Sequence, residues 1–237
     1  MDVINLNDNI LTLAPIAYIE NCYKTKFGVP RQSGIVNSVV SKIILDDKFR
    51  DGQALRELET YSHIWLIWGF SQNGESWSHT VRPPKLGGNK RVGVFASRSP
   101  FRPNPIGLSC VKIKKIEFSK KDGYIIYVIG ADLANGTPIY DIKPYIPYSD
   151  CRTDATGGFS VDNEKSKIYV EISEEVSDKI PSDLYDTVIE ILSQDPHPSY
   201  IENPGRVFYM EIDSYEIGFI CNGHKITVTE FNFINKY

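Results

Sequence analysis

Short apolar stretches separated by polar turns fill the first 150 residues, and this pattern predicts β-strands more than helices. In Ile106–Phe118 the second half alternates, because Val111, Ile113 and Ile116 stand between lysines and a glutamate. Ser62–Phe70 is almost continuously apolar, which is typical of a buried strand. We expect strands at Leu13–Glu20, Val39–Leu45, Ser62–Phe70, Val92–Ser97, Ile106–Phe118 and Tyr124–Gly130.

Helices are scarce in this part of the chain, where only Gln53–Glu59 is expected to form a short one. A parallel sheet needs a crossover, usually a helix, between successive strands. The sequence therefore favours an antiparallel barrel or sandwich. The Asp122-Gly123 pair predicts a hairpin turn within it.

A polar, glycine-containing stretch at 149–165 separates this part from the rest of the chain and marks a domain boundary. We expect a mainly β domain over residues 1–159 and a small α+β domain over residues 160–237. In the second domain, Asn222-Gly223 predicts a type I′ hairpin turn. Its strands are expected at Lys167–Ile172, Arg206–Ile212, Tyr215–Cys221 and His224–Phe233, and its helix at Pro181–Ser193.

The composition is that of an ordinary globular protein, with 41% hydrophobic and 24% charged residues. No apolar run approaches the roughly 20 residues needed to span a bilayer. Met1–Asn9 lacks the basic residues of a signal peptide, so we expect a cytoplasmic protein without membrane contact. The four cysteines and four histidines are scattered without metal-ligand spacing, and we expect no bound metal.

The net charge of −4 hides an uneven distribution of charge along the chain. Between Arg82 and Lys121, eleven lysines and arginines stand against one acidic residue, Glu117, which gives a block of +10 and leaves −14 for the other 197 residues. Such a block attracts an anionic partner whatever the overall isoelectric point. Its lysines from Lys112 onward also fit a solvated strand face, whereas its arginines lie in loop-like sequence.

The densest candidate for a binding loop runs from Gly93 to Ser109 and reads GVFASRSPFRPNPIGLS. Its three prolines fix φ and remove N–H donors, so the loop is stiff before any ligand arrives. A stiff loop holds the polar side chains of Arg98, Arg102 and Asn104 in place at little entropic cost. The alternative is a rigid barrel corner whose arginines cap main-chain carbonyls.

A second candidate, residues 131–150, gathers acidic, basic and phenolic side chains among three prolines. Alternation places Asp141, Lys143 and Tyr145 on one side of an extended segment, with Asp132 nearby in sequence. The alternative for this segment is a structural Asp–Lys pair. Smaller clusters are Pro30-Arg31-Gln32, Ser62-His63 and Arg82-Pro83-Pro84.

Several common motifs are missing from the sequence. No G-x-G-x-x-G follows a strand, so the chain lacks the signature of dinucleotide-binding and common Rossmann methyltransferase folds. Neither a P-loop nor a G-x-S-x-G elbow is present. The residue types alone thus indicate a β-rich protein that binds an anionic ligand.

Five motifs carry a resemblance to a known family, and together they cover about 140 residues, from Ile16 to about Phe159. In chain order they are FGVPRQSG, YSHIWLIWGF, RPPKLGGN, RVGVFASRSPFRPNPIGLS and GADLANGTPIYDIKPYIPYSD. This part of the chain resembles the TsaA-like, or TrmO, family of tRNA threonylcarbamoyl-adenosine methyltransferases. The C-terminal pieces LSQDPHPSY and RVFYMEIDSYEIGF resemble the family's second domain more loosely, with His197 where the family usually has arginine.

The resemblance implies a mainly β fold, with an antiparallel β-barrel methyltransferase domain that binds S-adenosylmethionine without a Rossmann fold. It implies a homodimer whose cofactor site lies near the subunit interface. It also implies methylation of the exocyclic nitrogen of threonylcarbamoyl-adenosine, the nucleoside next to the anticodon, in a subset of tRNAs.

We expect 97–109 and 132–145 to form two walls of the cofactor pocket. The acceptor nitrogen loses its proton during methyl transfer, and a carboxylate or phenolate can accept that proton, so Asp141 and Tyr145 are the candidate catalytic residues. Cofactor contacts are expected from Arg98, Ser99, Pro100, Arg102, Asn104, Pro105, Gly107, Leu108, Ser109, Asp132, Gly136, Thr137 and Asp141. Contacts to the tRNA or its threonyl carboxylate are expected from Pro30, Arg31, Gln32, His63, Arg82, Arg91 and Lys143.

Two other functions stay open at the level of sequence. A non-catalytic RNA-binding barrel would bind tRNA without S-adenosylmethionine. A methyltransferase acting on a small anionic metabolite would need no tRNA and would show weak salt dependence, whereas tRNA binding weakens steeply with salt.

Overall fold

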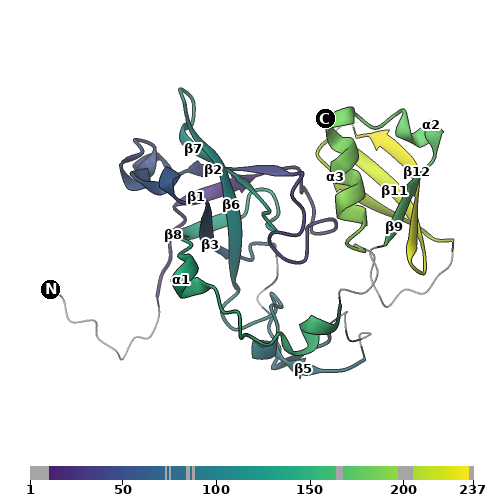
Figure 1. The fold of residues 1–237 in the computed structure, drawn as a ribbon, viewed down its shortest axis with the longest axis horizontal. Helices are drawn as coiled ribbons and strands as arrows, with labels where there is room; N and C mark the ends of the chain where they lie inside the picture. The colour runs from purple at the N-terminus through teal and green to yellow at the C-terminus, as the bar shows by residue number, and fades with distance from the viewer. Residues whose placement is uncertain are drawn as a thin grey trace.

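The structure is a computed structural model that describes residues 11–72, 74, 76–83, 86, 89–163, 168–196 and 205–234. Six strands form a closed antiparallel barrel in the order β1-β2-β7-β6-β3-β8, seen on the left of Figure 1. The strands of the barrel are β1 (Ala17–Glu20), β2 (Val40–Leu45), β3 (His63–Gly69), β6 (Ile106–Ser119), β7 (Gly123–Ile129) and β8 (Pro138–Pro144).

Alternation along the strands fills the inside of the barrel. In β3, Ile64, Leu66 and Trp68 are buried and belong to one hydrophobic cluster. The strands beside β3 add further buried side chains to this cluster, among them Val111 of β6 and Ile139 of β8. Because successive strand residues point to opposite faces, the intervening residues of β3 lie on the outer face of the barrel.

A second sheet has the order β10-β11-β12-β9, in which β9 and β12 run parallel and the other pairs antiparallel. The sheet and helix α3 lie on the right of Figure 1. Val188, Ile191 and Leu192 of α3 are buried in the hydrophobic cluster that includes this sheet. The elements of this domain are α2 (Glu174–Ser177), α3 (Ser182–Leu192), β9 (Tyr169–Ile172), β10 (Val207–Ile212), β11 (Tyr215–Asn222) and β12 (Lys225–Phe233).

The same hydrophobic cluster also includes part of the segment that connects β1 to β2. Tyr23, Val36 and Val39, which lie between β1 and β2 in the chain, are buried in the cluster with Val188 and Ile191 of α3. Burial of an apolar side chain contributes roughly 1.5–3 kcal/mol. The segment that connects β1 to β2 is therefore packed against the second domain.

Between β3 and β6 the chain leaves the barrel and forms a two-stranded ribbon. Strand β4 (Thr80–Val81) pairs with β5 (Val92–Gly93), and a 3-10 turn at Val94–Ala96 follows. After β8, the single helical turn α1 (Pro147–Asp150) and a 3-10 segment (Gly158–Asn163) continue toward the second domain.

The mainly β class and the antiparallel arrangement predicted from the sequence are confirmed. Four barrel strands, at Val39–Leu45, Ser62–Phe70, Ile106–Phe118 and Tyr124–Gly130, match the observed ends to within one residue. Among the described residues, no helix is long and apolar enough to cross a membrane.

Three local predictions are wrong. Gln53–Glu59 is not a helix but parts of two 3-10 turns, because Arg56 (ψ 132°) and Glu57 (φ 66°) leave the right-handed helical region and interrupt it. The strand expected at Leu13–Glu20 begins only at Ala17, after a proline that offers no N–H. The strand expected at Val92–Ser97 ends at Gly93 and turns into the 3-10 segment.

Candidate active site

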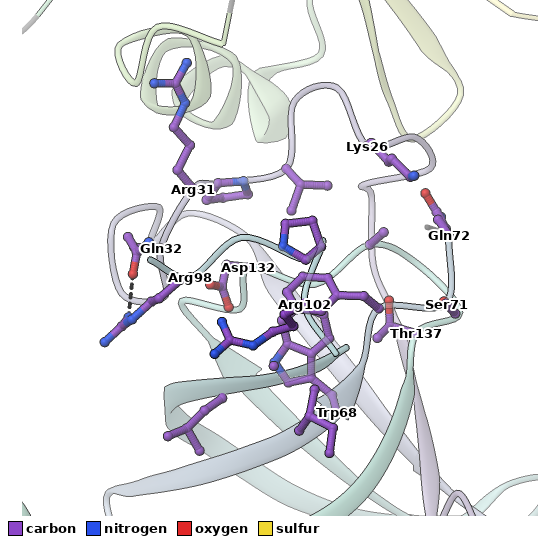
Figure 2. A pocket seen from close by; sticks show the side chains of 18 of the residues that line it. Lys26, Arg31, Gln32, Trp68, Ser71, Gln72, Arg98, Arg102, Asp132 and Thr137 are labelled. Carbon is purple, nitrogen blue, oxygen red and sulfur yellow. Dashed lines mark hydrogen bonds between the residues drawn. The ribbon is translucent and has the colours of Figure 1, made fainter. Parts of the chain in front are cut away.

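A cavity of about 640 Å³ opens at one end of the barrel (Figure 2). Its volume lies within the range of small-molecule sites, about 300–1,000 Å³. Four parts of the chain line it: the β1–β2 connection, the end of β3, the proline-rich loop that leads into β6, and the connection between β7 and β8.

An aromatic wall bounds one side of the cavity. The rings of Trp68 and Phe70 meet edge to face, with centroids 4.3 Å apart, and both line the cavity. Gly107 faces Trp68 in the register of β3 and β6. A Cβ atom on Gly107 would lie 2.2 Å from the indole ring, so only glycine leaves room for the indole at this position.

Hydrogen bonds link this wall to a carboxylate in the cavity. The indole Nε1 of Trp68 donates to Ser109 Oγ over 2.9 Å, and the Ser109 hydroxyl donates to Asp132 Oδ1. Ser109 is fully buried, while Asp132 is half-buried and lines the cavity. Burial raises the pKa of Asp132 above its ordinary value, although the bond from Ser109 and the charge of Arg98 oppose the shift.

Two arginines reach the cavity from the proline-rich loop. Arg98 Nη1 donates to the side-chain oxygen of Gln32 on the β1–β2 connection, as Figure 2 shows. Arg102 Nη1 donates to the main-chain oxygen of Ser97 over 3.1 Å, and the Ser97 hydroxyl donates to the carbonyl of Val94. Arg102 thus caps a carbonyl, as the structural alternative predicted, and it also lines the cavity.

The second domain holds the β1–β2 connection in place. Arg31 Nη2 donates to the main-chain oxygen of Asp195, just beyond α3, over 2.9 Å. The Glu190 carboxylate of α3 accepts the main-chain N–H groups of Asn37 and Ser38, each over 2.8 Å. Burial alone would raise the pKa of Glu190, but these hydrogen bonds outweigh it and leave the pKa below its ordinary value.

The structure brings together residues that the sequence assigned to separate roles. Pro30, Arg31 and Gln32, expected to contact tRNA, line the same cavity as much of the expected cofactor set. The members of that set that line it are Arg98, Pro100, Arg102, Gly107, Leu108, Asp132 and Thr137. Ser109 does not line the cavity but donates a hydrogen bond to Asp132, which does. The members that do not line it are Ser99, Asn104, Pro105, Gly136 and Asp141.

The two residues predicted to be catalytic, Asp141 and Tyr145, do not line this cavity within one chain. Asp141 forms an ion pair with Lys143, with 2.9 Å between Oδ2 and Nζ, as the structural alternative predicted. The ring of Tyr145 contacts His63 and Trp65, with centroids 6.2 and 5.7 Å apart. These residues belong to a second region, on the outer face of β3 and β8.

The last two residues expected to contact tRNA, Arg82 and Arg91, are exposed on the ribbon between β3 and β6. Arg91 Nε donates to the hydroxyl of Thr80 over 2.8 Å, which fixes that side chain on the ribbon. Neither arginine lines the cavity.

Sequence reasoning missed the aromatic wall and part of the polar rim. Trp68 and Phe70 lie in a stretch whose continuous apolarity indicates packing, and only their position at the end of a strand hinted at a site. Lys26, Ser71 and Gln72 also line the cavity, without a motif that marks them. Among the described residues, no three metal-ligating side chains gather to hold a metal ion.

Comparison with known proteins matches both parts of the chain. The profile described as the tRNA-methyltransferase O N-terminal domain matches residues 18–151, and that of the TrmO C-terminal domain matches residues 165–234. The tRNA (adenine(37)-N6)-methyltransferase of Escherichia coli is 38% identical over 211 residues, 85% of this chain and 89% of that protein.

Two further proteins match the chain over different lengths. A crystal structure of TrmO from Pseudomonas aeruginosa has a TM-score of 0.74 at 29% identity and covers 94% of this chain and 99% of that one. An S-adenosyl-L-methionine-binding protein of Archaeoglobus fulgidus is 35% identical over 141 residues, 60% of this chain and 94% of that protein.

The barrel, its cavity and these matches define the chain as a methyltransferase built on a β-barrel. Within that class, the chain belongs to the TrmO family. The departure from the family pattern at His197 lies outside the described residues.

Proposed function

We propose that the protein transfers a methyl group from S-adenosylmethionine to the exocyclic nitrogen of threonylcarbamoyl-adenosine, next to the anticodon of tRNA in the cytoplasm. The observation that carries this proposal is the cavity at the end of the barrel, where an aromatic wall, two arginines and a half-buried carboxylate converge. The names of the relatives support the tRNA adenosine as acceptor and the cofactor as donor.

The residues of the cavity fit such a cofactor in size and in chemistry. The faces of Trp68 and Phe70 suit a planar purine, because aromatic rings stack favourably in offset arrangements. Arg98 and Arg102 suit the carboxylate of the methionine part, since a guanidinium pairs with a carboxylate through two hydrogen bonds.

When bound, the cofactor supplies an electrophilic methyl group on a positively charged sulfur. The acceptor nitrogen gains this methyl group and loses its proton, and its lone pair is weak because it is conjugated with both a purine and a urea carbonyl. Asp132 is placed to accept that proton, directly or through a water molecule. Ser109 and Trp68 hold the carboxylate in one orientation by their hydrogen bonds.

The remaining cations of the cavity suit the anionic groups of the substrate. Lys26 and Arg31 lie on the rim of the cavity formed by the β1–β2 connection, and the Arg31 guanidinium is turned toward the main-chain oxygen of Asp195. A threonyl carboxylate or a tRNA phosphate is the group that such side chains bind.

We also propose that the protein is a homodimer built on the outer face of β8, β3 and β6. In their register, Asp141, Ile67 and Leu108 form one row across these strands. Leu108 is exposed and also borders the cavity, so a partner on this face would cover the cavity's rim. In such a dimer Asp141 comes close to the cavity of the partner subunit.

Light scattering tests the proposed dimer and should give twice the mass of one chain. A stable monomer that still turns over would contradict the dimer.

The test of the proposed reaction uses purified protein, methyl-labelled S-adenosylmethionine and tRNA that carries or lacks the threonylcarbamoyl group. Nucleoside mass spectrometry should find the label on threonylcarbamoyl-adenosine and on no other nucleoside. Equal labelling of both tRNAs would refute the modified adenosine as substrate, and labelling of neither would refute the reaction.

A further inference from the structure

The chain that forms the ribbon between β3 and β6 carries positive charge and, from Ser76 onward, no acidic residue. From Ser76 to Ile116 the chain contains no aspartate or glutamate. Three cationic side chains of the ribbon, Arg82, Lys90 and Arg91, are exposed. A surface of this kind attracts a phosphate backbone.

Aromatic side chains stand exposed beside these cations. Trp77 is 46% exposed, Phe95 80% and Phe101 47%. The ring of Trp77 meets that of His79 edge to face, with centroids 4.6 Å apart. Main-chain hydrogen bonds from Val94 to His79 and from Ser78 to Phe101 gather these four aromatic residues, although they are spread over 25 positions in the sequence.

This surface borders the cavity. Phe95 lies two positions before Ser97, and Phe101 lies between Pro100 and Arg102; all three of these neighbours line the cavity. If the target nucleoside binds in the cavity, the nucleotides on either side of it in the tRNA would therefore lie close to the exposed rings.

We propose that the ribbon surface, defined as Trp77, His79, Phe95 and Phe101 with Arg82, Lys90 and Arg91, binds the unpaired nucleotides that flank the target adenosine. The proposal rests on the proposed function and assigns the ribbon surface as the place where the anticodon loop of the tRNA binds. Unpaired bases stack on aromatic rings without regard to sequence, while the cations track the backbone. We favour RNA over a second protein chain because the same surface offers exposed rings for bases and cations for phosphates, with no aspartate or glutamate from Ser76 to Ile116.

The test measures binding of tRNA by fluorescence anisotropy at several salt concentrations. Trp77→Ala and Phe95→Ala should each weaken binding roughly tenfold, the loss expected for one stacked base, and leave the salt slope unchanged. Arg91→Ala should instead reduce the salt slope by about one unit. Affinity for S-adenosylmethionine should stay at the wild-type value in all three variants.

Phe118→Ala is the matched control. Phe118 is 64% exposed, meets Tyr124 edge to face at 5.4 Å and stands near lysines, but it lies on the β6–β7 hairpin at the other end of the barrel from the cavity. Its replacement should leave tRNA binding unchanged.

Three outcomes would overturn the proposal. The first is wild-type tRNA affinity in both aromatic variants, and the second is an equal loss in the Phe118 variant. The third is conversion of a dimer to a monomer by Trp77→Ala or Phe95→Ala with tRNA affinity per chain unchanged, which would assign the surface to a second copy. If wild-type protein binds tRNA but transfers no methyl group, the proposed function fails while this binding surface stands.

Discussion

Asp132 is the residue in which burial, hydrogen bonding and chemistry meet most closely. The sequence placed it among the cofactor contacts and gave the proton-accepting role to Asp141 and Tyr145. The structure favours Asp132 for that role within one chain, because it alone of the three borders the cavity. Its environment opposes ionisation, so its carboxylate is a stronger base than an exposed aspartate.

The first prediction concerns the pH dependence of Asp132. Because its pKa is raised, the rate of single-turnover methylation should climb with pH through that raised pKa and level off above it. Asp132→Asn should lower the plateau by about 10²-fold, within the range of general-base contributions, and remove this rise. An unchanged pH profile in the variant would assign the proton transfer to another group.

The raised pKa of Asp132 also makes the stability of the folded protein depend on pH. A carboxyl whose pKa is raised by folding lowers the stability of the folded state as the pH rises through that pKa, and this penalty is absent below its unfolded-state pKa. Asp132→Asn should therefore raise the melting temperature at neutral pH, and the gain should shrink as the pH falls. A melting temperature lowered equally at all pH values would show that the carboxylate is structural.

Gly107 tests the aromatic wall. In Gly107→Ala the new methyl group would overlap the Trp68 indole, which must shift and lose its bond to Ser109. Affinity for S-adenosylmethionine, measured by calorimetry, should fall roughly tenfold, the cost of one displaced ring contact and hydrogen bond. Gly93→Ala is the control, because a Cβ there meets nothing within 4 Å. Equal affinities in both variants would mean that the indole does not contact the cofactor.

Among the elements, the strands were predictable and the connections between them were not. Apolar runs, partial alternation and a turn pair located β2, β3, β6 and β7 to within one residue, because barrel strands bury apolar side chains. β8 was read only as an extended segment, since prolines at both ends and polar residues between them obscure the pattern. The failed helix at Gln53–Glu59 is broken by the extended Arg56 and the left-handed Glu57, which no local composition reveals.

The contact between α3 and the β1–β2 connection predicts a role for the second domain in preparing the cavity. Glu190→Gln keeps the size of the side chain but turns one of two acceptors into a donor that faces a main-chain N–H. Trypsin should then cleave faster after Lys26 or Arg31, and affinity for S-adenosylmethionine should fall about tenfold, as for a lost charged hydrogen bond.

The control for this prediction is Asp186→Asn, which removes a charge from an exposed position on the same helix. It should leave both cleavage and affinity at wild-type values. Faster cleavage throughout the chain in Glu190→Gln would indicate general unfolding in place of local release.

At the scale of the whole molecule, the sequence predicted the chemistry of the site better than its boundaries. The proline-rich loop and the Pro30-Arg31-Gln32 cluster could be identified from residue types, and the structure brings both to one cavity. The aromatic wall could not, because a tryptophan in a buried strand has the same pattern whether it fills a core or borders a ligand. Nor could sequence show that the second domain holds one side of the cavity.

The positively charged residues between Arg82 and Lys121 fall into groups with different roles. The +10 block contains the arginines of the cavity, those of the ribbon and the lysines of the β6–β7 hairpin. Lys115 is already paired with Glu117 at 2.8 Å on the surface of the barrel. The hairpin lysines therefore contribute a screened, long-range attraction to RNA, whereas the cavity arginines are held where a ligand binds.

The most direct test of the central claim, that the cavity is the site of methyl transfer, compares these two groups of cations. Single-turnover methylation of threonylcarbamoylated tRNA is measured for Arg98→Lys, Arg102→Lys and a Lys114/Lys115 double alanine variant. Each arginine variant should be about ten- to a hundredfold slower, because lysine cannot make a two-point contact and a lost charged hydrogen bond costs roughly 1.5–3 kcal/mol. The double lysine variant should react at nearly the wild-type rate at saturating tRNA. Wild-type rates in both arginine variants, together with an inactive lysine variant, would place the active site on another part of the chain.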